Sequence, residues 1–154
     1  MFQDRFKITP ASYLILTRDN EILLSRRCNT GYFDGCYGLP SGHLEGEETF
    51  RQAMIREAKE EINADLSPAD LELIHVMNRK MPGNERMDLF FVVRNFSREI
   101  RNKEPEKCDD LRWFGFDNLP PKIVPSVRRA IDYFRKGIIY SEWEGEEEGA
   151  SDPA

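Results

Sequence analysis

Three glutamates stand close together in the stretch "SGHLEGEETFRQAMIREAKEEINA", residues 41–64: Glu57, Glu60 and Glu61. Like charges one helical turn apart repel each other by roughly 0.2–0.5 kcal/mol per pair, so a helix that gathers them needs a reason. Carboxylate oxygens are the ligands that Mg²⁺ and Mn²⁺ prefer, and both cations share their coordination with substrate phosphates. The residue types therefore indicate a metal-binding helix that acts on a phosphate compound.

Both ends of this helix are marked in the sequence. Thr49 and Gln52 have the spacing of a capping box, so Phe50 is predicted to be the first helical residue. Asn63 is suited to the left-handed conformation that ends a helix, and it follows the last turn directly. The glutamates are thus predicted to lie in the second half of the helix.

A helical wheel shows which side of the helix the glutamates occupy. With Glu57 at 0° and about 100° per residue, Glu60 falls at about 300° and Glu61 at about 40°. The apolar stripe consists of Phe50, Met54, Ala58 and Ile62, and the solvent face consists of Gln52, Arg56, Lys59 and Asn63. The three glutamates are therefore expected away from water, where an ionised carboxylate needs a basic partner or a bound cation. Arg56 and Lys59 point the wrong way for most of that compensation, so the wheel favours a cation over an ordinary charged face.

The other elements must hold this helix against a sheet. Strands are predicted at 11–18, 22–26, 71–77, 87–94 and 111–116. A second amphipathic helix is predicted at 124–136, and a loop of about 20 residues, long enough to be functional, precedes the first helix. This order of elements predicts an α/β fold in which helices cover a mixed β-sheet.

Composition bounds the class of protein. Of the 154 residues, 1–140 are expected to form a single domain, and 141–154 are expected to be an acidic, disordered tail. The net charge of −6 argues against a partner of long nucleic acid, although a divalent cation can still bring in a small anion. Three cysteines without CxxC spacing, no apolar run of transmembrane length and no secretory signal predict a cytoplasmic protein that contacts no membrane.

Residues 42–64 resemble the Nudix box. The matching positions are Gly42, Glu48, Arg56, Glu57, Ala58, Glu60 and Glu61. One position departs from the pattern, because Asn63 stands where the family usually has glycine, and asparagine is the next-best left-handed cap. The resemblance implies that Glu48 and Arg56 are structural and pair to hold the loop on the helix.

Further segments are similar to the MutT-like branch of this family, which hydrolyses purine nucleoside triphosphates, including modified ones. They are "NEILLSRR" at 20–27, "EPEKC" at 104–108, Trp113 and "LPP" at 119–121. The resemblance implies a Nudix-type α/β/α sandwich with a mixed sheet, Mg²⁺ as cofactor with Mn²⁺ as a substitute, and attack of water on an internal phosphorus. A nucleoside triphosphate would then yield the monophosphate and pyrophosphate.

The same resemblance implies the catalytic residues Glu57, Glu60 and Glu61. Glu57 and Glu61, one helical turn apart, match the principal metal ligands of the family. Glu60 is either a further metal ligand or the base that orients the attacking water. Gly42 is expected to offer its backbone carbonyl to the metal, because the missing side chain allows close approach.

Residues outside the box complete the expected site. Glu106 is the preferred further acidic ligand, with Asp109 and Glu104 as candidates, and the alternative is a solvated acidic loop. Arg27 is expected to clamp substrate phosphate, and the alternative is a surface arginine at a strand end. Four aromatic residues are candidates for stacking on a base or for the core: Tyr32, Phe33, Phe90 and Trp113.

Three functions fit these patterns, all with a small nucleotide as partner and with a homodimer left open. The leading hypothesis is Mg²⁺-dependent hydrolysis of a nucleoside triphosphate, with an ordinary, oxidised or otherwise modified purine. The first alternative is the same chemistry on another nucleoside-diphosphate-linked substrate, such as a nucleotide sugar or a capped RNA end. The second is a non-catalytic nucleotide-sensing module, in which box carboxylates are often lost, whereas this chain keeps every one.

Overall fold

The computed structural model describes residues 4–96 and 99–144. Within them the elements in chain order are β1 (Thr9–Arg18), β2 (Glu21–Arg27), β3 (Tyr37–Gly38), β4 (Ser41–His43), α1 (Phe50–Ile62), the 3₁₀ turn η1 (Pro68–Asp70), β5 (Glu72–Lys80), β6 (Arg86–Val93), β7 (Cys108–Gly115), α2 (Pro125–Lys136) and β8 (Tyr140–Glu144).

The strands form one mixed sheet that opens into two halves. The strand order is β3-β2-β1-β6-β5-β8, with β4 paired to β1 and β7 paired to β2. β1 runs parallel to β6 and β5 runs parallel to β8, whereas β1 and β2 are antiparallel. β1 and β2 pair only near their shared turn, through Thr17 with Ile22 and Arg18 with Glu21. Beyond that point β4 takes the place beside β1, so β2, β3 and β7 form a separate half.

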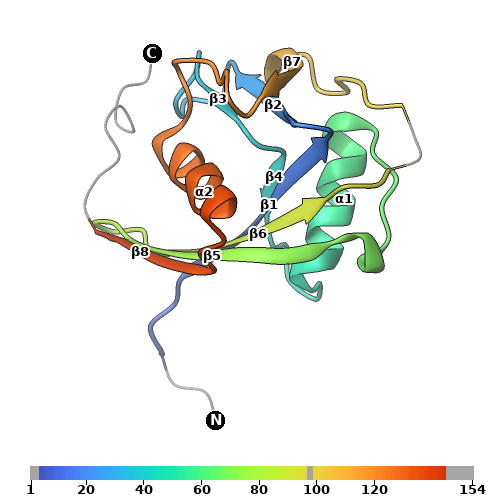
Figure 1. Cartoon of the computed structure of the whole chain (residues 1–154). Helices are drawn as coiled ribbons and strands as arrows, with labels where there is room; N and C mark the ends of the chain where they lie inside the picture. Colours follow the sequence, from blue (N-terminus) through green and yellow to red (C-terminus); the bar gives the residue numbers. More distant parts are fainter. Residues whose placement is uncertain (1–3, 97–98, 145–154) are drawn as a thin grey trace.

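The central strand β1 supplies side chains to two cores. Successive residues of a strand point to opposite faces of its sheet. Leu14 and Leu16 pack with the apolar stripe of α1, whereas Ile15 packs in the core that includes α2. Figure 1 shows α1 and α2 on either side of β1 and β4. The α/β/α sandwich with a mixed sheet, expected from the sequence, is confirmed.

The expected boundaries of α1 are also confirmed. The Oγ1 of Thr49 accepts a bond from the Gln52 backbone N–H at 3.1 Å, and Oε1 of Gln52 accepts one from the Thr49 backbone N–H at 2.8 Å. These two bonds form the capping box that starts the helix at Phe50. Asn63 has φ 62° and ψ 23°, the left-handed conformation that ends it. The side chains of α1 are therefore fixed in rotation by both ends of the helix.

Three short strands were not expected from the sequence. The segment before α1, predicted to be a loop, contains β3 and β4. Strands of two and three residues are too short to show an alternating pattern, so their pairing partners decide them. β8 crosses the domain boundary expected at residue 140 and continues to Glu144 as the partner of β5. The rest of the expected tail, 145–154, lies outside the described residues.

No helix in the described part of the chain has the length and apolar character needed to span a bilayer.

Candidate active site

The three glutamates of α1 differ in exposure. Glu61 is partly buried and accepts a hydrogen bond from the backbone N–H of Ser41 on β4 at 3.2 Å. The side chain of Glu57 is 16% exposed, whereas that of Glu60 is 52% exposed. The expectation that all three lie away from water is therefore wrong for Glu60. On the wheel Glu60 lies on the edge of the cluster that adjoins the solvent face, and no other element covers it.

The buried pair resists ionisation. Burial raises the pKa of Glu61 well above its ordinary range, and the neighbouring Glu57 carboxylate raises it further. Burial also raises the pKa of Glu57, although its bond to Arg56 opposes that change. The two carboxyl groups lie one helical turn apart on α1 and line the same cavity. Joint ionisation of two neighbouring, partly buried carboxylates is unfavourable, and a divalent cation bound between them would favour it.

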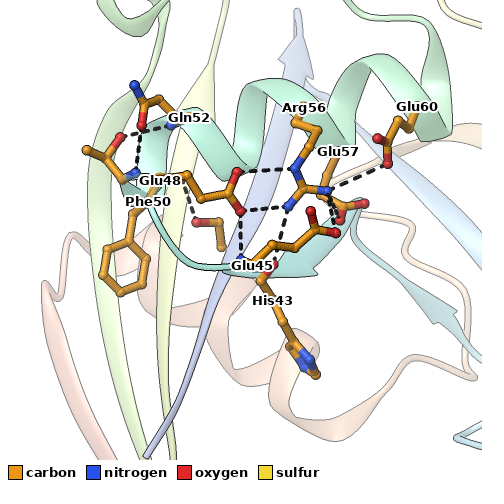
Figure 2. Close-up of polar contacts among 10 residues, drawn as sticks. His43, Glu45, Glu48, Phe50, Gln52, Arg56, Glu57 and Glu60 are labelled. Carbon is orange, nitrogen blue, oxygen red and sulfur yellow. Dashed lines mark hydrogen bonds and ion pairs between the residues drawn. The ribbon is translucent and has the colours of Figure 1, made fainter.

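Arg56 is the basic partner of this cluster (Figure 2). Its guanidinium donates to both oxygens of Glu48, at 2.8 and 3.2 Å, and to Oε1 of Glu57 at 2.7 Å. It also lies 3.4 Å from Glu45 and 3.7 Å from Glu60. The bond from Arg56 lowers the pKa of Glu48. The wheel placed Arg56 away from the carboxylates, and this was wrong because its long side chain folds back along the helix surface.

Gly42 on β4 lies directly against the side chain of Glu57. A Cβ built on residue 42 would lie 2.3 Å from Cγ, Cδ and Oε1 of Glu57. The pairing of Gly42 with Ser12 on β1 fixes this approach, since it anchors β4 to the sheet that α1 covers. Only glycine permits so close a contact. The expected carbonyl ligand is therefore on a strand that touches the carboxylates.

Outside the box, Glu104 is the acidic candidate that lines the cavity of the α1 glutamates, whereas Glu106, the preferred candidate, does not line it. Glu104 lines the same cavity as the α1 glutamates, and its charge raises the pKa of both buried ones. Glu106 is exposed and does not line that cavity, and Asp109 forms an ion pair with Arg26 at 2.7 Å. A turn closed by the Lys107 N–H on the Glu104 carbonyl decides which acid faces inward.

Arg27 stands at the end of β2 and lines the same cavity. Its Nε donates to the carbonyl of Tyr32 at 2.5 Å, and its Nη2 donates to Oγ1 of Thr30 at 3.1 Å. The guanidinium also lies 5.2 Å from the centre of the Tyr32 ring. These contacts hold the arginine against the cavity wall, where Lys107 adds a second cation.

One cavity of about 790 Å³ is lined by Gly42, Glu57, Glu60, Glu61, Glu104 and Arg27. Its wall also contains Arg79 on β5 and Arg86 on β6, which reasoning from the sequence missed. One signal was available, because each arginine lies within two residues of a predicted strand. A charged side chain that faces inward from a strand needs a partner. The cavity is therefore walled by cations from both halves of the sheet.

The aromatic candidates are mostly occupied elsewhere. Of the four, Tyr32 alone lines the cavity. Phe33 and Phe90 are buried in the core that includes α2, and Trp113 stacks on Phe96 with ring centres 5.9 Å apart. The cavity thus offers one aromatic ring of this set for stacking on a base.

The donors of the cluster fit a hard divalent cation. Among residues 4–96 and 99–144, no three acidic, histidine or cysteine side chains converge closely enough to cage a metal ion on their own. Mg²⁺ needs no such cage, because it keeps several waters and binds through one or two carboxylates together with substrate phosphate. Glu57 and Glu61, which line one cavity with their hard oxygen donors, fit that smaller set.

Comparison with known proteins gives a consistent family. The family model described as "NUDIX domain" matches residues 7–134. The crystal structure of the MutT NUDIX hydrolase from Burkholderia pseudomallei is 28% identical, with a TM-score of 0.75, and covers 82% of this chain and 98% of its own.

The names of two curated relatives state the compound on which each acts. The NAD-capped RNA hydrolase NudC of Pseudomonas aeruginosa is 32% identical over 122 residues, which are 79% of this chain and 41% of the relative. The ADP-ribose pyrophosphatase of Methanocaldococcus jannaschii is 29% identical over 121 residues, which are 79% of this chain and 70% of the relative. The chain thus spans about two fifths of the length of the NudC relative that it matches. Gly42, Glu57, Glu60 and Glu61 of the box line one cavity, and the family model matches most of the chain, so this chain belongs to the Nudix hydrolase family.

Proposed function

We propose that this enzyme hydrolyses the diphosphate linkage of a nucleoside diphosphate joined to a second group, a class that includes ADP-ribose and NAD. The observation that carries the proposal is that Glu57 and Glu61, one helical turn apart on α1, line one cavity whose wall also holds Arg27. The names of the two curated relatives support this class over the nucleoside triphosphates expected from the sequence. The preferred function is therefore the first alternative of the sequence analysis.

The residues that would hold Mg²⁺, or Mn²⁺ in its place, are Glu57, Glu61 and the backbone carbonyl of Gly42. Glu104 is the acidic residue outside the box that is placed to assist them, and Glu60 is a further candidate. When bound, the cation polarises a phosphoryl oxygen and lowers the pKa of a coordinated water.

The chain's own residues position the reactants. Arg56 holds Glu57 at 2.7 Å and ties it to Glu48, so the carboxylate keeps one orientation. Arg27 is placed to donate its planar fork to the oxygens of the substrate diphosphate. Glu60 reaches solvent, where its carboxylate can accept a hydrogen bond from an attacking water. Attack of that water on one phosphorus and departure of the other phosphate would convert ADP-ribose to AMP and ribose 5-phosphate.

Nucleoside triphosphates are the second candidate, because this chain matches the MutT structure from Burkholderia pseudomallei over 98% of that structure's length. The two substrate classes release different products. A triphosphate attacked at its α-phosphorus gives pyrophosphate. ADP-ribose and NAD give two monophosphates and no pyrophosphate. Product identity therefore separates the candidates without any assumption about affinity.

The test is a substrate panel with Mg²⁺: ADP-ribose, NAD, NAD-capped RNA, dATP, dGTP and 8-oxo-dGTP. We expect kcat/KM for ADP-ribose or NAD to exceed that for every triphosphate by at least about tenfold, with AMP released and no pyrophosphate. A higher kcat/KM for any triphosphate, with pyrophosphate released, would return the function to the MutT-like class. Recovery of every compound unchanged from single-turnover reactions with excess protein would indicate a nucleotide-sensing module.

A further inference from the structure

Arg86 is a cavity-lining arginine whose hydrogen bonds are all weak. Its Nη1 lies 3.3 Å from Nε2 of His43, and its Nη2 lies 3.2 Å from the Tyr13 hydroxyl and 3.4 Å from Oδ1 of Asp88. Charge-assisted bonds of arginine to carboxylate are ordinarily about 2.7–2.9 Å long. In the described part of the chain, the Nε of Arg86 is buried without a hydrogen-bond partner. The Arg86 guanidinium is thus held in place, but its donors lack short hydrogen bonds to acceptors.

The carboxylate nearest to Arg86 is committed to another residue. Asp88 is completely buried, and its Oδ2 accepts a bond of 2.7 Å from Nε of Arg79. Arg79 and Arg86 are direct cross-strand partners on β5 and β6, a position in which two like charges destabilise a sheet. The hydrogen bond of Asp88 to Arg79 is therefore short, whereas its contact with Arg86 is 3.4 Å long.

The other two neighbours of Arg86 carry no compensating charge. His43 meets Arg86 through a ring nitrogen at 3.3 Å, and an imidazole supplies no negative charge. Tyr13 offers only its hydroxyl. A buried donor without a partner is rare in folded proteins and calls for a physical reason. A ligand that supplies negative oxygens would satisfy the Arg86 fork.

The position of Arg86 sets it apart from the α1 carboxylates. β1 lies between β4, which carries Gly42, and β6, which carries Arg86. Two strand spacings separate β4 from β6, about 9–10 Å. The His43 ring points away from α1 in Figure 2, and it is this ring that contacts Arg86. Arg86 and the α1 carboxylates therefore reach the cavity from different elements.

We propose that Arg86 binds a second negatively charged group of the substrate, a phosphate or a carboxylate outside the diphosphate that is cleaved. His43 and Tyr13 hold the guanidinium at the cavity wall. Asp88, which is bonded to Arg79, contacts the guanidinium as well. The inference rests on the proposed function, since it places the scissile diphosphate on the α1 carboxylates. It makes Arg86 a specificity-determining residue for substrates whose attached group carries an extra oxyanion.

The first test uses three dinucleotides that share one diphosphate linkage: NAD, NADP with an added 2′-phosphate, and nicotinic acid adenine dinucleotide with a carboxylate in place of the amide. In Arg86→Gln we expect kcat/KM for NADP or for the nicotinic acid compound to fall at least about tenfold, mainly through KM. We expect kcat/KM for NAD to stay within about twofold. An equal loss for all three compounds, or no loss for any, would overturn the proposal.

The matched control is Arg94→Gln, which removes the same charge from an exposed arginine that pairs with Glu72 and does not line the cavity. It should leave all three values unchanged. Thermal unfolding of Arg86→Gln and of Arg86→Lys checks the fold, and the lysine variant keeps the charge but loses the fork. Partial recovery of the NADP or nicotinic acid rate in Arg86→Lys would support a role in binding an anion.

The second test needs no turnover and no metal. It therefore stands even if the wild-type enzyme cleaves neither these dinucleotides nor ADP-ribose, a result that would refute the proposed function alone. Inorganic phosphate is titrated into protein labelled with ¹⁵N at arginine, in the presence of EDTA. The Nε–H signal of Arg86, identified by its loss in Arg86→Lys, should shift and saturate, and it should do so in Arg27→Gln as well. An Arg86 signal that stays in place at millimolar phosphate would overturn the inference.

Discussion

At the scale of single residues, the proposed chemistry depends on two neighbouring carboxyl groups. Glu57 and Glu61 line one cavity, and each has a pKa that burial raises. Glutamine has the same shape but cannot carry the charge that a divalent cation requires. We therefore expect Glu57→Gln and Glu61→Gln to lose more than about 100-fold in kcat/KM while the fold is kept. Steady-state kinetics together with circular dichroism measure the two effects separately.

A suitable control for these variants is Glu21→Gln, because Glu21 is partly exposed, pairs with Arg18 and does not line the cavity. It should retain the wild-type rate. If either box variant also turned over at the wild-type rate, the α1 pair would not be the catalytic cluster.

Residue-level prediction succeeded where geometry is regular. The helical period was enough to place Glu57 and Glu61 on one side of α1, because a helix rotates by a constant angle per residue. It failed for Arg56, whose long side chain reaches around the helix to carboxylates that the wheel places elsewhere. It ranked Glu104 behind Glu106 and did not find Arg86, since a turn and a strand pairing decide where these side chains face, and neither has a sequence period.

At the scale of elements, the site depends on the contact between β4 and α1. Both ends of α1 could be predicted from capping residues, whereas β4 could not, because only its pairing with β1 defines it. This contact leaves no room for a side chain at residue 42. We expect Gly42→Ala to displace Glu57 and to lower kcat about 100-fold, since a shift of about 1 Å in a positioned group has that effect. Single-turnover kinetics at saturating Mg²⁺ provide the measurement.

Gly115→Ala is the matched control for this change. Gly115 also lies in a strand, but a Cβ there meets no atom within 4 Å, and its φ is not positive. Normal activity in both alanine variants would show that the close packing of β4 on Glu57 is not needed for catalysis.

At the scale of the whole molecule, the fold brings two halves of a sheet around one cavity. β1 and β2 separate after their shared turn, and the cavity takes Arg27 from the β2 half and Arg86 from the β6 half. The class of the fold could be predicted from the order of elements, but the separation of the halves could not, because it depends on which strand pairs with β1. Cations on both halves, with carboxylates on α1 between them in the chain, favour a substrate that carries more than one anionic group.

The buried pair should also link the stability of the whole fold to pH and to metal. A carboxyl group whose pKa is raised in the folded state stabilises the fold below its ordinary pKa, and this contribution is lost as the pH rises through the folded-state value. Glu61 is such a group. In EDTA, wild type should therefore lose thermal stability relative to Glu61→Gln as the pH rises from about 5 to about 8.

Mg²⁺ should reverse this loss, because the cation binds the ionised pair and is linked to release of the proton. The quantity to follow is the difference in thermal stability between wild type and Glu61→Gln. His43 and His75, whose pKa values burial lowers, contribute stability that increases with pH in both proteins, so their effect cancels in this difference. Thermal unfolding at several pH values, in EDTA and in Mg²⁺, measures it. A difference that does not change with pH in EDTA, or an equal gain from Mg²⁺ in both proteins, would show that Glu61 is neither protonated in the free fold nor a ligand to the cation.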